Sequence, residues 1–251
     1  MLKLTSFFTL ALLAVHGLSS VSPSHRRRAK RRLDAAPLPA AASVPFAGFA
    51  ADPSINAPAI YAAAQASHTK ILATYPTTPE RKAYSNIYGD WQNMTGVSAF
   101  HFIADMDVDC DGPKANCKGN TDGQPDTSFG ALDATRVPYF VLPERFTKDN
   151  KDILMDNALG AIICDGKMFY GIYGDQDADS PQVIGEASIL IAQTCFGASI
   201  DGGNGHPQND VAYVVFGTKV PSGIQKTSID ISALKALGDA QAKLLQKALG
   251  V

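Results

Sequence analysis

The chain has few of the residues on which several common enzyme classes depend. Its 251 residues include one Trp, four Cys and five His. The three His beyond residue 32 are far apart, and no GxSxG motif accompanies them, which argues against a serine hydrolase. GxGxxG and Walker motifs are also missing, so the sequence carries no nucleotide-binding fingerprint. CxxC and HxxxH spacings do not occur, which disfavours a zinc site. We expect no metal and no cofactor.

Long apolar runs are absent beyond the first 20 residues, so no later segment is expected to span a membrane. Residues 1–20 have a Lys near the start, a short apolar core and small residues at the end, which is typical of a secretory signal peptide. The basic run SHRRRAKRR falls in residues 21–32, and its dibasic steps indicate a pro-segment that is cleaved. The alternative for this run is binding to nucleic acid or anionic lipid. We therefore expect a secreted, extracellular protein.

Removal of the first 32 residues changes the charge of the chain. It leaves 15 Lys and Arg against 24 Asp and Glu, a formal charge of −9. A nucleic-acid partner is disfavoured because phosphate binding requires positive patches. A cationic partner fits better, although acidity also serves solubility alone.

The remaining chain is long enough for one domain with a full core. Residues 33–56 are rich in Ala and Pro and are predicted to be a leader, and residues 57–251 a single catalytic domain. We expect this domain to be monomeric. The sequon at Asn93 predicts a glycosylation acceptor on the surface. Four Cys in an oxidising compartment predict two disulfides, and of three pairings we favour Cys110 with Cys117 and Cys164 with Cys195.

Hydrophobic periodicity predicts strands in the middle of the domain and helices at its ends. Residues 57–75 have helical spacing up to Pro76 and are predicted to form one helix, and residues 232–249 an amphipathic helix packed on the core. Residues 186–195 are also predicted to be helical. Predicted strands are 97–112, 137–142, 160–164, 168–173 and 211–217, with a hairpin turn at Asp165-Gly166.

A first acidic group contains Asp105, Asp107, Asp109 and Asp111. Alternate carboxylates followed by Gly112 resemble the start of a calcium loop, but the twelfth position is Lys118, where a Glu is required. On a strand the four carboxylates would share one face and would repel one another without a cation. That cation is a metal, a Lys or a cationic substrate, and the alternative is that most of these carboxylates are solvated.

A second acidic group contains Asp175, Asp177, Asp179 and Glu186. Asp175 follows Gly174 at the end of a predicted strand, and Glu186 follows Gly185 at the start of a predicted helix. Glycosidic hydrolysis requires two carboxyl groups, one to protonate the leaving oxygen and one to activate water or to attack. Asp175 and Glu186 are therefore a candidate catalytic pair.

Five ordered segments between residues 105 and 216 resemble the fungal chitosanases of glycoside hydrolase family 75. They are DMDVDCDG (105–112), GNTDGQPDTSFGALDA (119–134), MFYGIYGDQDAD (168–179), GEASILIAQTCFG (185–197) and GNGHPQNDVAYVVF (203–216). The resemblance implies secreted endo-hydrolysis of β-1,4-linked glucosamine polymers with inversion at the anomeric carbon. It also implies that the Asp of the Gly-Asp step and the Glu of the Gly-Glu-Ala-Ser step are catalytic.

Carried onto this chain, the resemblance implies Glu186 as general acid and Asp175 as general base. Inversion would place their carboxyl groups about 6.5–9.5 Å apart. The sequence departs from the family pattern around 173–178, which makes Asp177 a rival for the base. The substrate-binding residues expected for chitosan or chito-oligosaccharide are Asp105, Asp107, Asp109, Tyr173, Asp177 and His206.

We expect a mainly β fold, a compact antiparallel barrel of about six strands with flanking helices, resembling the double-psi barrels of certain endoglucanases. Two other functions stay open. One is a secreted carbohydrate-binding protein without turnover, and the other is a calcium-binding module built on residues 105–112.

Overall fold

The computed structural model describes residues 48–114, 117–120 and 123–251. The predicted signal peptide, the pro-segment and most of the leader lie outside these residues. No helix in the described part of the chain is long and apolar enough to cross a membrane.

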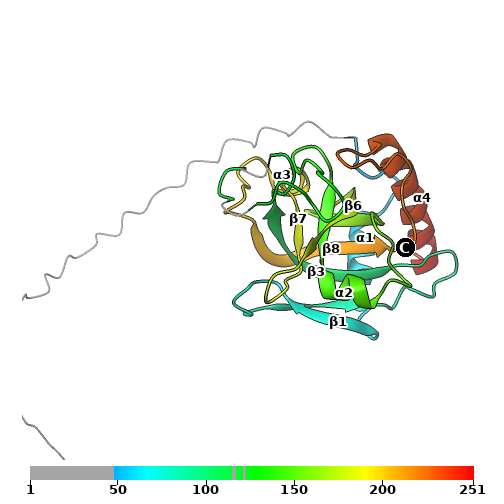
Figure 1. Ribbon diagram of the computed structural model, residues 1–251. Coiled ribbons are helices and arrows are strands. Elements are labelled where there is room, and N and C mark those ends of the chain that lie inside the picture. Colours follow the sequence, from blue (N-terminus) through cyan, green and yellow to red (C-terminus); the bar gives the residue numbers. More distant parts are fainter. Residues whose placement is uncertain (1–47, 115–116, 121–122) are drawn as a thin grey trace, which may run out of the picture. The chain divides into compact units, whose positions relative to one another are not determined.

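Within the described residues, six strands close into a barrel (Figure 1). In order around the ring they are β3 (Phe100–Asp109), β7 (Glu186–Ser188), β4 (Tyr139–Pro143), β6 (Lys167–Asp177), β5 (Leu159–Cys164) and β8 (His206–Phe216), which pairs back to β3. The expected mainly β barrel with flanking helices is confirmed. The barrel is mixed, however, because β3 runs parallel to β7 and β4 runs parallel to β6.

A hairpin outside the ring is made by β1 (Ile71–Pro76) and β2 (Tyr84–Tyr88), and β2 joins it to β3. The sequence analysis placed residues 57–75 in one helix, and this prediction is wrong. Helix α1 (Ala57–Ala66) ends early, and the Asp90 carboxylate accepts hydrogen bonds of 3.0 Å from the N–H groups of Thr69 and Lys70. The β-branched and aromatic residues that follow favour a strand once β2 can pair with them.

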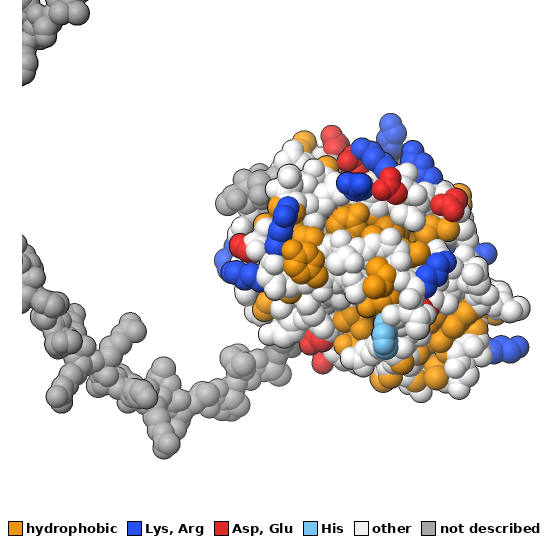
Figure 2. Space-filling view, turned by 90° about the horizontal axis from the view of Figure 1, so that it is seen from below, with side chains coloured by type: hydrophobic (Ala, Val, Ile, Leu, Met, Phe, Trp, Pro, Cys, Tyr) orange, Lys and Arg blue, Asp and Glu red, His pale blue; other side chains and the backbone are white. Residues whose placement is uncertain are grey.

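Figure 2 views the molecule from the side on which β1 lies, and hydrophobic side chains occupy much of this face. Ile71 and Tyr84, in the hairpin, are 55% and 56% exposed. The hairpin therefore keeps large apolar side chains in contact with solvent.

The predicted helix 186–195 also needs correction. Its first three residues form β7, and helix α3 (Ile189–Phe196) begins only after them. Strand β7 pairs with β3 on one side and with β4 on the other. Three residues are too few to show the alternation of apolar and polar side chains by which a strand is recognised in the sequence. The pairings with β3 and β4 hold β7 in place.

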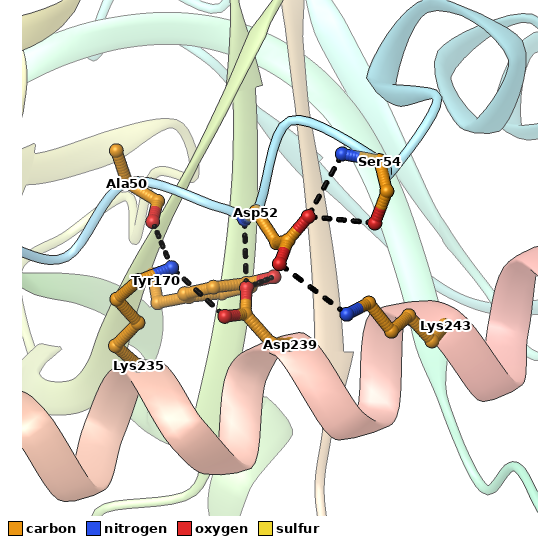
Figure 3. Close-up of polar contacts among 7 residues, drawn as sticks. All are labelled: Ala50, Asp52, Ser54, Tyr170, Lys235, Asp239 and Lys243. Atoms are coloured by element: carbon orange, nitrogen blue, oxygen red, sulfur yellow. Dashed lines mark hydrogen bonds and ion pairs between the residues drawn. The ribbon is translucent and has the colours of Figure 1, made fainter.

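Two further helices flank the barrel, α2 (Glu144–Asp149) and α4 (Ile231–Leu249). Helix α4 corresponds closely to the predicted amphipathic helix, and its Leu234 and Leu245 are buried. Figure 3 shows how α4 holds the segment before α1. Asp239 accepts hydrogen bonds from Asp52 N–H at 2.8 Å and from the Tyr170 hydroxyl at 3.0 Å.

Residues 48–56 thus pack on the domain although the sequence analysis placed them at the end of the leader. Phe49 is 1% exposed, and Lys235 of α4 donates a 2.9 Å hydrogen bond to the Ala50 carbonyl. The two disulfides join Cys110 to Cys117 and Cys164 to Cys195, which is the pairing favoured from the sequence.

Candidate active site

Asp175 and Glu186 lie on either side of the same residue of the barrel. Val141 of β4 pairs with Asp175 of β6 in parallel register and with Glu186 of β7 in antiparallel register. Directly paired residues project to one face of a sheet, and neighbouring strands are about 4.8 Å apart, so the two Cα atoms stand about 10 Å apart. The side chains of both residues line one cleft of about 400 Å³.

The glycine before each carboxylate has a steric function. At Gly174 the β4–β6 register shifts, because Phe140 pairs with Tyr173 and Val141 with Asp175, and the extra residue forms a bulge that aims Asp175. A Cβ at Gly174 would lie 2.5 Å from Tyr139 Cβ. Gly185 has a φ of 108°, and a Cβ there would collide with the Asp105 carboxylate. Both positions therefore require glycine, because a side chain there would displace the carboxyl residue that follows.

The cleft is acidic on every side that the structure describes. Its described lining contains no Lys and no Arg. The acidic lining residues are Asp109, Asp111, Asp175, Asp177, Asp179 and Glu186. Such a cleft attracts cations and disfavours anionic ligands.

Asp175 is held by three hydrogen-bond donors on one oxygen. Its Oδ1 accepts from Ser128 N–H at 2.8 Å, from Ser128 Oγ at 2.6 Å and from Gln176 N–H at 2.7 Å. Burial raises the pKa of this carboxyl group above its ordinary value, and the hydrogen bonds from Ser128 and Gln176 reduce that rise. The donors fix the orientation of the carboxylate and favour its ionised form.

Glu186 has the opposite environment. Burial raises its pKa well above the ordinary value, and the negative charges of Asp109, Asp177, Asp107 and Asp175 raise it further. None of the hydrogen bonds described in this part of the chain reaches its carboxyl group. Glu186 therefore holds a proton more readily than Asp175, because only Asp175 has hydrogen-bond donors that stabilise its anion.

Asp109 lines the same cleft as Asp175 and Glu186 and interacts electrostatically with both. It is 6% exposed, and burial, followed by the charge of Asp175, raises its pKa. Single oxygens of Asp109, Asp111 and Asp175 come within 4.8 Å of one another. A cation could bridge this group, but the predicted calcium loop is not formed, because Asp107 and Asp109 lie on β3 rather than in a loop.

Asp177, the rival to Asp175, also lines the cleft. Its two oxygens accept hydrogen bonds from the N–H groups of Asp179, at 2.8 Å, and Val183. These bonds tie the loop that follows β6 to the carboxylate. Asp177 thus organises the loop between the two candidate catalytic residues.

The other predicted binding residues are dispersed. Asp105 is 2% exposed and faces Gly185, and Asp107 pairs with Glu186 in the sheet, but neither is among the residues lining the cleft. Tyr173 is 1% exposed and packs edge-on against Phe129 at 4.9 Å, which leaves no ring face open to a sugar. His206 lines a separate pocket, where its ring stacks on that of Phe196 with 3.8 Å between the ring centroids.

Two residues of the site escaped the sequence analysis. Ser128 comes from a loop 47 residues before its partner Asp175, and Val141 is one apolar residue in a buried strand. Neither position carries a local signal, because their roles arise only from pairing across the barrel. Asn93, in contrast, is exposed as the sequon requires.

Comparison with known proteins identifies the family of the chain. The family described as fungal chitosanase of glycosyl hydrolase group 75 matches residues 106–245, which include both candidate catalytic residues. Endo-chitosanase C of Aspergillus oryzae is 47% identical over 210 residues, covering 81% of this chain and 55% of that relative. An endo-chitosanase of Aspergillus fumigatus is 29% identical, covering 73% of this chain and 87% of that relative.

The chain spans about half the length of the endo-chitosanase C proteins of Aspergillus oryzae that it matches. The matched residues run from within β3 into α4 and thus include most of the barrel. The chain belongs to the fungal chitosanases of glycosyl hydrolase group 75.

Proposed function

We propose that this protein is a secreted endo-chitosanase that hydrolyses β-1,4 bonds of glucosamine polymers with inversion. The observation that carries the proposal is the contrast between two carboxyl groups flanking Val141. One is surrounded by hydrogen-bond donors, and the other by carboxylates. Environments that separate two pKa values in this way assign a base and an acid.

In the mechanism, Glu186 donates its proton to the glycosidic oxygen as the bond to the anomeric carbon breaks. Asp175 accepts a proton from a water that attacks the same carbon from the opposite face. The strand spacing supports inversion, since Cα atoms about 10 Å apart leave room for a sugar and a water between the carboxyl groups. The substrate fits because its ammonium groups would meet a cleft whose described lining bears six carboxyl groups and no basic side chain.

Hydrolysis of chitosan by the wild type and three variants tests the proposal. Glu186→Gln and Asp175→Asn should each lower kcat by at least about a hundredfold, because each removes one proton-transfer group. Asp177→Asn tests whether Asp177 rather than Asp175 is the base. It should retain more activity than Asp175→Asn, because both Asp177 oxygens already accept hydrogen bonds from N–H groups of the loop. The anomer of fresh product, read by NMR, should be α.

Three outcomes would contradict the proposal or part of it. Initial β product would exclude inversion, and full activity of Glu186→Gln would remove the proposed acid. Chitosan binding without any hydrolysis by the wild type would favour the alternative, a carbohydrate-binding protein without turnover. Secretion is tested by finding the protein in the medium with its chain starting after residue 32.

A further inference from the structure

A second cavity adjoins the acidic cleft and has the opposite charge. It measures about 420 Å³, and Asp179 lines both cavities. Two tyrosines and two arginines line it, Tyr75 and Tyr84 from the β1–β2 hairpin, Arg81 from the hairpin turn and Arg145 from α2. Residues 180–182 complete its wall.

This cavity is fixed in position relative to Glu186. Ile184, two residues before Glu186, donates a 3.0 Å hydrogen bond from its N–H to the Pro76 carbonyl at the end of β1. Arg145 N–H donates a 3.0 Å hydrogen bond to the Gln182 side chain. The hairpin, α2 and the loop before β7 are thus joined by hydrogen bonds, so a polymer bound at Glu186 would reach the cavity at a constant distance along its chain.

The two guanidinium groups of the cavity outnumber its one carboxylate, that of Asp179, so the net charge of the lining disfavours an ammonium group. Arg81 is exposed and has no ion-pair partner among the described residues. The ion pair that Arg145 makes among the described residues is with the largely exposed Asp149, with Nε 3.6 Å from Oδ2, so that solvent screens the pair. Arg81 also has a φ of 57°, which is uncommon for a residue with a Cβ, and its N–H donates to the Thr78 carbonyl at 2.9 Å.

A neutral acetylated sugar suits these groups better than a protonated amino sugar. Guanidinium groups donate hydrogen bonds and accept none, so an acetamide carbonyl is a suitable partner. Tyrosine rings pack against the apolar face of a pyranose and against a methyl group. Tyr84 is 56% exposed and offers such a surface.

We propose that the cavity lined by Tyr75, Tyr84, Arg81 and Arg145 is a subsite for an N-acetylglucosamine unit. The enzyme then acts preferentially on partially acetylated chitosan, with unacetylated units in the acidic cleft and an acetylated unit at a fixed distance from the bond that is cut. This subsite rests on the proposed chitosanase function and gives it a substrate preference.

Initial rates on partially acetylated and on fully deacetylated chitosan of matched length test the subsite. The wild type should show a ratio of kcat/KM values above one in favour of the acetylated polymer. Arg81→Glu should lower this ratio by about fivefold, because it replaces a repelling charge by one that attracts ammonium. Tyr84→Ala should lower kcat/KM on the acetylated polymer more than on the deacetylated one. Lys82→Glu, with the same charge change outside the cavity, should leave the ratio unchanged.

Mass spectrometry of the product oligosaccharides provides a second measurement. Wild-type products should be enriched in an acetylated unit at one fixed position from the new end, and Arg81→Glu products should lose that enrichment. Equal wild-type efficiency on both polymers, or an unchanged ratio in Arg81→Glu, would overturn the subsite and leave chitosan hydrolysis standing. Failure to hydrolyse either polymer would overturn the proposed function and the subsite together.

Discussion

Single residues around the two carboxyl groups determine their orientation, and Gly185 is the clearest case. Its positive φ and its contact with Asp105 both exclude a side chain. Gly185→Ala should cost several kcal/mol of unfolding free energy and lower kcat by at least about tenfold, because small displacements of a catalytic group are costly. Denaturant unfolding and chitosan hydrolysis measure the two effects.

Gly166→Ala is the matched control. Gly166 also has a positive φ, of 70°, but nothing lies within 4 Å of the added Cβ. This variant should cost about 1–2 kcal/mol and leave kcat unchanged. Equal kinetic effects of the two substitutions would show that contact with Asp105 does not matter.

Asp109 offers a test of how Glu186, the proposed acid, is kept protonated. Of the four negative charges that raise the pKa of Glu186, that of Asp109 has the largest effect. The other three are those of Asp177, Asp107 and Asp175. Removing it in Asp109→Asn should make Glu186 easier to ionise, so the alkaline limb of the kcat profile should move to lower pH. Asp179→Asn should leave that limb in place, because Asp179 is not among the charges that raise this pKa. A limb unmoved by Asp109→Asn would contradict this account.

His101 links stability to pH. It is 0% exposed, and its ring centroid lies 4.1 Å from that of Trp91. Burial lowers the pKa of His101 from 6.5 to about 4, although the negative charge of Asp90 acts to raise it. Because the unfolded chain binds a proton that the folded protein excludes, the contribution of neutral His101 to stability is complete above pH 6.5 and is lost as the pH falls to about 4. The loss should be about 3 kcal/mol at about 1.4 kcal/mol per unit.

The variant His101→Phe should lack this contribution, so its free energy of unfolding relative to wild type should rise by about 3 kcal/mol between pH 7 and pH 4. Buried carboxyl groups such as Asp105, whose pKa is raised to about 7, contribute equally to both proteins and cancel in this difference. His68→Gln, at an exposed position, is the control and should keep the contribution of His101. A difference between wild type and His101→Phe that stays constant across this range would show that His101 is not held neutral.

At the scale of elements, the disulfide Cys164–Cys195 joins the end of β5 to α3 and closes a 31-residue loop that contains both candidate catalytic residues. Replacing both Cys by Ala should cost about 4 kcal/mol, because a longer closed loop restricts the unfolded chain more. Removal of Cys110–Cys117, which are 7 residues apart, should cost about 2.5 kcal/mol. Chemical denaturation measures both, and equal losses would contradict the loop-length explanation.

The elements that the sequence analysis missed are those that depend on a partner strand. Strands such as β5 and β8 have long apolar runs and are visible locally. β7 has three residues, and β1 follows a helix whose periodicity continues into it. In both cases pairing with another strand overrides local propensity, because β1 pairs with β2 and β7 pairs with β3 and β4.

For the whole molecule, the formal charge of −9 beyond residue 32 predicts attraction to a cationic polymer. The KM for chitosan should therefore rise severalfold as the Debye length falls from about 30 Å to about 3 Å with added salt. Asp179→Asn, which removes a charge from the cleft, should reduce this salt dependence, and Asp152→Asn, at an exposed position outside the cleft, should change it less. A KM independent of salt would argue against electrostatic attraction.

The sequence by itself determined the fold class, the number of disulfides and the two glycine-preceded carboxyl residues, because strand alternation, Cys count and short motifs are local properties. Only the tertiary structure decided that Val141 separates Asp175 from Glu186, that Ser128 holds the Asp175 carboxylate, and that the acidic cleft adjoins a cavity containing Arg81 and Arg145. These relations arise from pairing between strands and loops far apart in the chain. No local pattern records them, because closure of the barrel brings the residues together.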